Sequence, residues 1–128
     1  MSDHKLRAIG ETPIVREPTR PTEFEVQATL WVELRRLGYN VRGEVPVQLP
    51  QRKRCRFDLA AFEEGRLVGI IECKAAPITH RTSAGWAGTR QGRRYGGFSV
   101  EVIVIYGMEQ AERLIADVER GAVLFNVG

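Results

Sequence analysis

Residues 56–74 constrain the fold more than any other part of this chain. They form two apolar runs separated by a short polar turn that contains Gly65. Such runs on both sides of a glycine-containing turn are typical of a β-hairpin. Successive side chains of a strand point to opposite faces, so residues two apart share a face. We therefore expect Glu72 and Lys74 to share a face of the second strand, together with Ile70.

Asp58 lies inside the first of these runs, where an ionised side chain is rarely placed unless it is paired or bound to a metal. If residues 64–66 form a three-residue loop, Glu63 faces Leu67 and Asp58 faces Glu72. Directly opposed residues have Cβ atoms roughly 4.5–5.5 Å apart, so two carboxylates could bind one cation. A shift of one residue would turn Asp58 to the other face. The alternative is that these charges are ordinary solvated ends of strands.

The composition fits one soluble domain. The 128 residues are 43% hydrophobic and 27% charged, as in ordinary globular domains. We expect an extended N-terminal arm over residues 1–21, which contain three prolines, and a folded domain over residues 22–128. No apolar run approaches the roughly 20 residues that span a bilayer, and no secretory signal is evident. Cys55 and Cys73 do not have the spacing of a zinc site. We therefore expect a cytoplasmic protein without membrane contact.

Arginine is clustered although the net charge is only +3. One cluster precedes Asp58 and another follows the hairpin: Arg52, Lys53, Arg54 and Arg56, then Arg90, Arg93 and Arg94. Clustered arginines suit bidentate contacts with phosphate. Solvated surface charge remains the alternative for any single arginine.

Helical spacing of apolar residues predicts a first helix from Thr22 to Leu37, ended by Gly38. Its predicted apolar face contains Phe24, Ala28, Trp31, Leu34 and Leu37, with Leu30. Thr22 and Glu25 form a capping box at its start. This box gives Glu25 a sufficient structural role, so a catalytic role has to be argued against it.

The remaining elements give the predicted order α-β-β-β-α-β-α-β. Strands are expected over residues 40–49, 57–62, 67–74, 99–106 and 122–127, and helices over 84–95 and 108–120. The segment 84–95 has three glycines on one helical face, and a partly irregular loop is its alternative. A crossover between 67–74 and 99–106 predicts that these strands are parallel. We expect a three-layer α/β fold, a mixed sheet with helices on both faces.

This pattern resembles the PD-(D/E)xK nuclease superfamily, which has the restriction-endonuclease-like fold. The resemblance covers about Thr22 to Tyr106 and rests on Phe57-Asp58 and Glu72-Cys73-Lys74, which 13 residues separate. The residue before Asp58 is Phe rather than Pro. Among subgroups, the chain is similar to the small virus-type replication-repair nucleases and the Holliday-junction resolvases.

The resemblance implies a metal-dependent phosphodiesterase site. Mg²⁺, with Mn²⁺ as a substitute, would be bound by Asp58, Glu72 and the Cys73 carbonyl, and Glu25 on the first helix would support it. Lys74 would position the attacking water. Gln91 and Tyr95 match a Gln-x-x-x-Tyr pair that many members carry on the second helix. The residues implied to contact nucleic acid are Gln91, Tyr95, Arg90, Arg93, Arg94, Arg52, Lys53, Arg54 and Arg56.

The leading hypothesis is therefore a metal-dependent, structure-selective DNA endonuclease in replication, repair or recombination. Branched or nicked DNA is the expected substrate, and a homodimer would supply the surface that a small domain lacks. A non-catalytic nucleic-acid-binding or assembly subunit on the same fold is the alternative from another class. A third interpretation is an α/β domain whose Asp58, Glu72 and Lys74 are ordinary surface charges.

Overall fold

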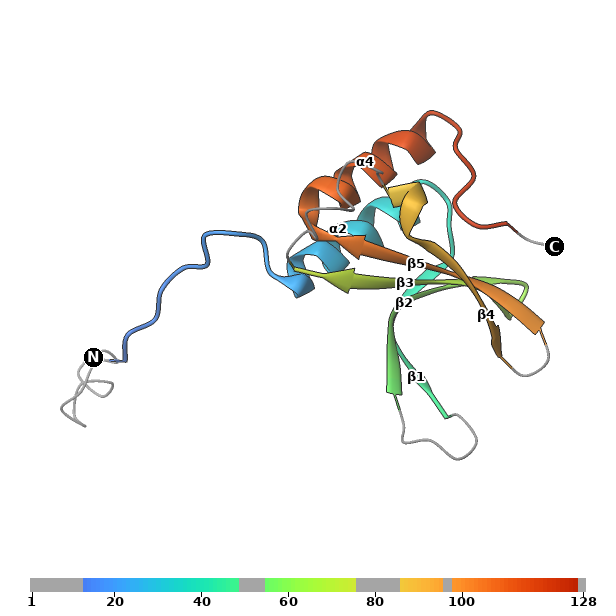
Figure 1. Ribbon diagram of the computed structural model, residues 1–128, viewed down its shortest axis with the longest axis horizontal. Coiled ribbons are helices and arrows are strands. Elements are labelled where there is room, and N and C mark those ends of the chain that lie inside the picture. The colour runs from blue at the N-terminus through green and yellow to red at the C-terminus, as the bar shows by residue number, and fades with distance from the viewer. Residues whose placement is uncertain (1–12, 49–54, 76–85, 96–97, 127–128) are drawn as a thin grey trace.

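The computed structural model describes residues 13–48, 55–75, 86–95 and 98–126. Within them the chain is an α/β domain built on one mixed sheet (Figure 1). Its elements are α2 (Glu23–Arg36), β1 (Val41–Val47), β2 (Cys55–Glu63), β3 (Arg66–Lys74), the 3-10 turn η1 (Trp86–Thr89), β4 (Arg90–Tyr95), β5 (Phe98–Tyr106) and α4 (Gly107–Glu119). Residues 13–20 are exposed and extend away from the domain.

The five strands lie in the order β1-β2-β3-β5-β4. Strands β3 and β5 are parallel, and every other neighbouring pair is antiparallel. The predicted mixed sheet and the predicted parallel pair are therefore confirmed. Strand β5 lies between β3 and β4 and is buried on both faces, which explains its nearly continuous run of β-branched residues.

Both helices cover the same face of the sheet (Figure 1). Between them lies the helix-side core, whose largest members are Leu30, Leu34, Leu59, Ile71, Ile103, Ile105 and Leu114. The opposite face carries the far-side core, which consists of Phe57, Ala60, Ile70, Val100, Val102 and Val104. Strand and turn side chains such as Val45 and Leu67 pack against this second core. In the described residues, the prediction of helices on both faces is therefore wrong.

Helix α2 begins as predicted but turns a different face to the sheet. Thr22 is its N-cap and accepts a hydrogen bond from the Glu25 N–H. The buried side chains are Val26, Gln27, Leu30 and Leu34, whereas the side chain of Phe24 is 69% exposed. The buried face of α2 is therefore apolar except for Gln27.

Two other predicted elements differ from the structure. Residues 86–95, predicted as part of a helix, form η1 and the edge strand β4, and residues 76–85 lie outside the described part. Hydrogen bonding to the free edge of β5 decides this conformation, and the glycine-rich sequence resists helix formation. Residues 122–126 are irregular rather than a strand, and neighbouring Leu124 and Phe125 are both buried.

A bulge fixes the register of the central hairpin. The loop is a two-residue turn, Glu64-Gly65, whose φ angles of 51° and 78° are both positive, as a type I′ turn requires. A three-residue loop was predicted, so the pairing next to the turn is one residue off. A register shift between Ala61 and Phe62 absorbs that residue, and Leu59 pairs with Ile71.

A substitution at Gly69 would test how tightly the C-terminal segment around Phe125 packs on β3. A Cβ atom at position 69 would overlap the ring of Phe125, which is itself buried. We expect Gly69→Ala to lower the free energy of unfolding by about 1–3 kcal/mol, the usual effect of overpacking. Urea denaturation measures this change.

Gly92→Ala on strand β4 is the matched control, because a Cβ atom there meets nothing within 4 Å. It should leave stability unchanged or raise it by up to about 1 kcal/mol. Equal effects at the two positions would contradict this packing.

Candidate functional site

The register brings Asp58 opposite Glu72, as the sequence predicted. Leu59 pairs with Ile71 and Ala60 with Ile70, so the next step along the ladder places Asp58 across from Glu72. Ala60 and Ile70 belong to the far-side core. By strand alternation on β3, Glu72 projects from that same face, which neither helix covers in the described residues.

Asp58 lies where strand β2 bends. Phe57 packs in the far-side core, whereas Leu59, only two residues away, packs in the helix-side core. A regular strand would place both on one face. Beside the bend, Asp58 Oδ2 accepts a hydrogen bond of 2.8 Å from the Cys73 N–H. The Asp58 carboxylate is therefore fixed to the main chain of the residue after Glu72.

The charges of the two acids interact. Burial, followed by the charge of Asp58, raises the pKa of Glu72 above its ordinary value. The charges of Lys74 and Arg93 oppose this rise, and the charge of Glu23 adds to it. A half-buried acid with a raised pKa beside a second acid is a common feature of functional sites, where a cation relieves the repulsion.

Of the glutamates at the start of α2, Glu23 is the one whose charge acts on Glu72. Glu25 is exposed, its side chain accepts a hydrogen bond from the Thr22 hydroxyl at 3.2 Å, and its N–H donates to that hydroxyl. Glu23 raises the pKa of both Glu72 and Cys73. The sequence contained a signal for this: Glu23 lies four residues before the buried Gln27, on the stripe that faces the sheet.

Lys74 ends β3 on the same face as Glu72, and its side chain is exposed. It pairs in register with Tyr106 at the end of β5. The Cys73 side chain points the other way, into the helix-side core, where burial raises the pKa of its thiol. Only the main chain of Cys73 can therefore contribute to the site.

Strand β4 divides the second basic cluster between the two faces of the sheet. Gln91 pairs with Val102 and Arg93 with Val100, so both lie on the same face of the sheet as Glu72. Arg90 and Arg94 lie on the helix side. Arg90 stacks 4.9 Å from the Trp86 ring centroid, forms an ion pair with Glu101 and donates to the carbonyls of residues 123 and 124. Arg90 thus anchors the C-terminal segment.

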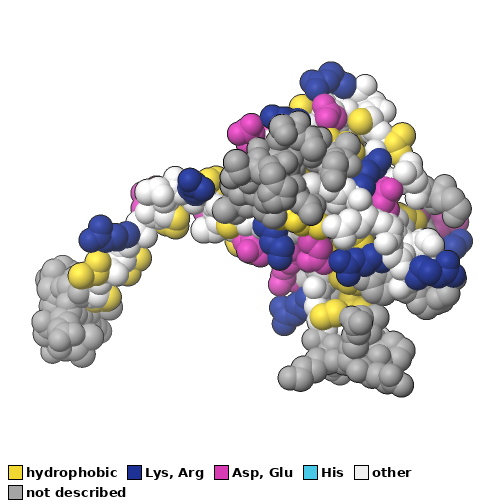
Figure 2. All heavy atoms as spheres, viewed as in Figure 1, with side chains coloured by type: hydrophobic (Ala, Val, Ile, Leu, Met, Phe, Trp, Pro, Cys, Tyr) yellow, Lys and Arg dark blue, Asp and Glu magenta, His cyan; other side chains and the backbone are white. Residues whose placement is uncertain are grey.

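The first basic cluster is only partly described. Arg56 is exposed and forms an ion pair of 3.3 Å with Glu44. Arg52, Lys53 and Arg54 lie outside the described residues, as does the side chain of Tyr95. Figure 2 shows Asp and Glu side chains gathered below α2, with Lys and Arg side chains on either side of them.

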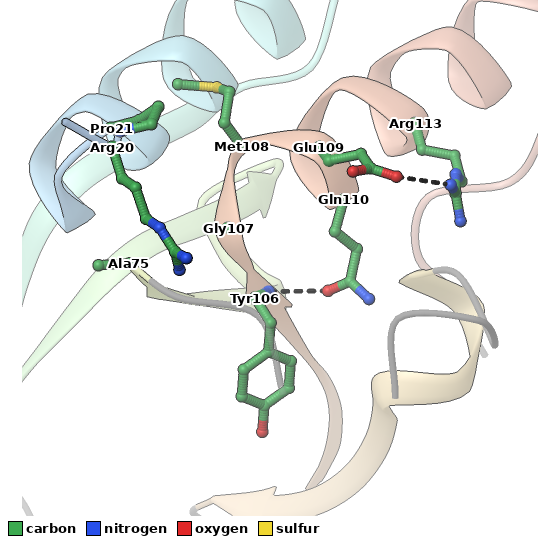
Figure 3. A pocket seen from close by; sticks show the side chains of 9 residues that line it. All are labelled: Arg20, Pro21, Ala75, Tyr106, Gly107, Met108, Glu109, Gln110 and Arg113. Atoms are coloured by element: carbon green, nitrogen blue, oxygen red, sulfur yellow. Dashed lines mark hydrogen bonds and ion pairs between the residues drawn. The ribbon is translucent and has the colours of Figure 1, made fainter. Parts of the chain in front are cut away.

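A cavity of about 280 Å³ opens at the carboxyl ends of β3 and β5. Figure 3 shows Arg20 directed toward Ala75 and Tyr106 from one side, with the first turn of α4 on the other. Ala75 directly follows Lys74, so the cavity adjoins the candidate site. Ligands of open α/β sheets commonly bind beyond the carboxyl ends of the strands.

The donor set fits Mg²⁺ better than zinc. Among the described residues, no group of three or more His, Cys, Asp and Glu side chains is placed to bind a metal. Mg²⁺ is usually bound by one or two carboxylates, and waters and substrate phosphates complete its coordination. Asp58 and Glu72 meet that requirement, whereas structural zinc requires four ligands.

Comparison with known proteins identifies no relative. No protein-family model, no curated protein and no solved structure matches this chain. Within the described residues, no helix is long and apolar enough to cross a bilayer.

The raised pKa of Glu72 predicts how stability changes with pH. Above its usual pKa of 4.5, the folded protein retains the Glu72 proton to a higher pH than the unfolded chain does. Stability therefore falls as pH rises through this window, and below it the difference vanishes. In EDTA, Glu72→Gln should have a larger free energy of unfolding than the wild type at pH 7, and the difference should shrink toward pH 4.

Urea denaturation at both pH values measures this effect. Glu63→Gln, an exposed change in the same hairpin, should stay within about 0.5 kcal/mol of the wild type. A Glu72→Gln variant that is less stable than the wild type at pH 7 would contradict the repulsion between the two acids.

Proposed function

We propose that this chain is a Mg²⁺-dependent nuclease that hydrolyses phosphodiester bonds in DNA. The observation that carries the proposal is the opposition of Asp58 and Glu72 across the hairpin, with Lys74 two residues after Glu72 on β3. The restriction-endonuclease-like fold is part of the proposal. It is supported by the order of a helix, an antiparallel hairpin that bears the acids, and a parallel strand beside it.

In the proposed reaction, Asp58 and Glu72 bind the cation. When bound, Mg²⁺ acts as a Lewis acid on the phosphate and lowers the pKa of a water ligand. The ammonium group of Lys74, on the same face, orients the attacking water and stabilises the negative charge that develops on phosphate. Arg93 and Gln91 on β4 hold the backbone of the nucleic acid next to the acids.

The arrangement favours recognition of the phosphate backbone over base sequence. Lys74 and Arg93 are exposed on β3 and β4, and the charges of both act on Glu72. Backbone contacts of this type give affinity without sequence information. We therefore propose that the shape of the DNA, such as a branch, flap or nick, determines where it is cut.

The first test is cleavage of supercoiled plasmid, flap and four-way-junction DNA with Mg²⁺, Mn²⁺ or EDTA. We expect cutting that requires the metal. Lys74→Ala should lower the rate by about 10²–10³-fold, the usual effect of removing one charge-stabilising group, and Asp58→Ala should abolish cutting. Thermal unfolding of each variant controls for folding.

Binding without cutting, unaffected by either substitution, would overturn the nuclease proposal. It would favour the second candidate, a non-catalytic nucleic-acid-binding subunit on the same fold. That candidate is favoured by the lack of a third metal-binding side chain among the described residues.

The two glutamates at the start of α2 form a matched pair for a second test. Glu23→Gln removes a charge that acts on Glu72, so we expect metal-dependent cleavage to fall by about tenfold, as for other residues that support a metal site. Glu25→Gln keeps the capping box, because Gln is also suited to this position. It should leave both cleavage and stability unchanged. If metal-dependent cleavage falls further in Glu25→Gln than in Glu23→Gln, Glu25 rather than Glu23 supports the metal site.

A further inference from the structure

Gln27 is a buried polar side chain on an otherwise apolar stripe of α2. It is 5% exposed and lies among Val26, Leu30 and Leu34. A buried amide destabilises a protein unless it is hydrogen-bonded. Its Nε2 atom donates to the main-chain oxygen of Asp58 at 3.0 Å and to Glu44 Oε2 at 2.8 Å. Both hydrogens of the amide are therefore used.

These two acceptors lie where the ladder between β1 and β2 is interrupted. Gly43 pairs with Leu59 and Val45 with Phe57, but no pair forms between them in this described hairpin. Glu44 has a φ of 53°, in the left-handed region that non-glycine residues rarely adopt. Gln27 supplies the hydrogen bond to Asp58 that a regular neighbouring strand would otherwise supply.

Glu44 is held in turn by its neighbours. It accepts from Gln27 and forms an ion pair with Arg56, and the hydrogen bond from Gln27 is the main reason that its pKa is lowered. Non-glycine residues in such backbone conformations persist only where the surrounding structure fixes them. The bend in the β1–β2 hairpin is therefore connected to α2 through one amide.

Asp58 is thus fixed from two directions. Its carboxylate accepts from the Cys73 N–H on β3, and its carbonyl accepts from Gln27 on α2. We propose that Gln27 is a positioning residue that sets the affinity of the Asp58–Glu72 pair for a divalent cation without touching it. This inference rests on the proposed function, because it requires that the pair bind a cation.

The test is the dissociation constant of Mn²⁺ for the full-length protein without DNA, measured from the EPR signal of free Mn²⁺. Gln27→Met keeps the side-chain length and removes both donors. We expect its Mn²⁺ affinity to be about 10–100-fold weaker, the range for residues that orient metal ligands. Thr89→Val removes another buried hydrogen bond, to the Trp86 carbonyl, and should leave Mn²⁺ affinity unchanged at a comparable loss of thermal stability.

Gln27→Glu separates positioning from charge. An added carboxylate close to the site would by itself strengthen cation binding. A protonated Glu offers one hydrogen, against the two of the amide, and an ionised one offers none. Loss of positioning therefore predicts weaker Mn²⁺ binding in Gln27→Glu, the opposite of the charge effect.

Each outcome decides the inference. Weaker Mn²⁺ binding in Gln27→Met, with binding retained in Thr89→Val, supports it, and weaker binding in Gln27→Glu supports it further. Wild-type affinity in a folded Gln27→Met overturns it and leaves the proposed function intact. Wild-type protein that binds no Mn²⁺ in an Asp58-dependent manner overturns both.

Discussion

Repulsion between Asp58 and Glu72 is the interaction on which the rest of the account depends. Two carboxylates on opposed positions of a β-hairpin destabilise the fold unless something compensates. The protein holds them there with a Cys73 N–H, a buried Gln27 and a left-handed residue at Glu44. A repulsive contact that several hydrogen bonds hold in place is typical of a ligand-binding centre. A cation bound between the two carboxylates would attract both and so replace their repulsion.

Much of the fold could be predicted from local patterns. The hairpin, the β-branched strand β5 and the two capped or amphipathic helices each carry their own signal, and all occur. Strand β4 could not be predicted, because its sequence Arg-Gln-Gly-Arg-Arg-Tyr has no apolar alternation. It is a strand because β5 offers it hydrogen bonds, a tertiary effect that outweighs local propensity.

The candidate site was predicted in its centre and missed at its margins. Glu72 and Lys74 share a face because strand alternation holds along β3, and a bulge restored the register that a wrong loop length would have shifted. Glu25 was assigned to the site from the resemblance alone, whereas in the structure it is the charge of Glu23 that acts on Glu72. Gln27 and Glu44 were missed because their roles depend on contacts between residues 17 and 31 positions apart.

The most direct measurement is a crystal structure of the wild-type protein soaked in Mn²⁺, with anomalous diffraction recorded at the manganese edge. If Asp58 and Glu72 bind a divalent cation together, one strong anomalous peak will be bonded to carboxylate oxygens of both residues, at about 2.0–2.2 Å, close to the distance expected for Mg²⁺. A peak elsewhere, or carboxylates that remain apart without a peak between them, would contradict cation binding by this pair.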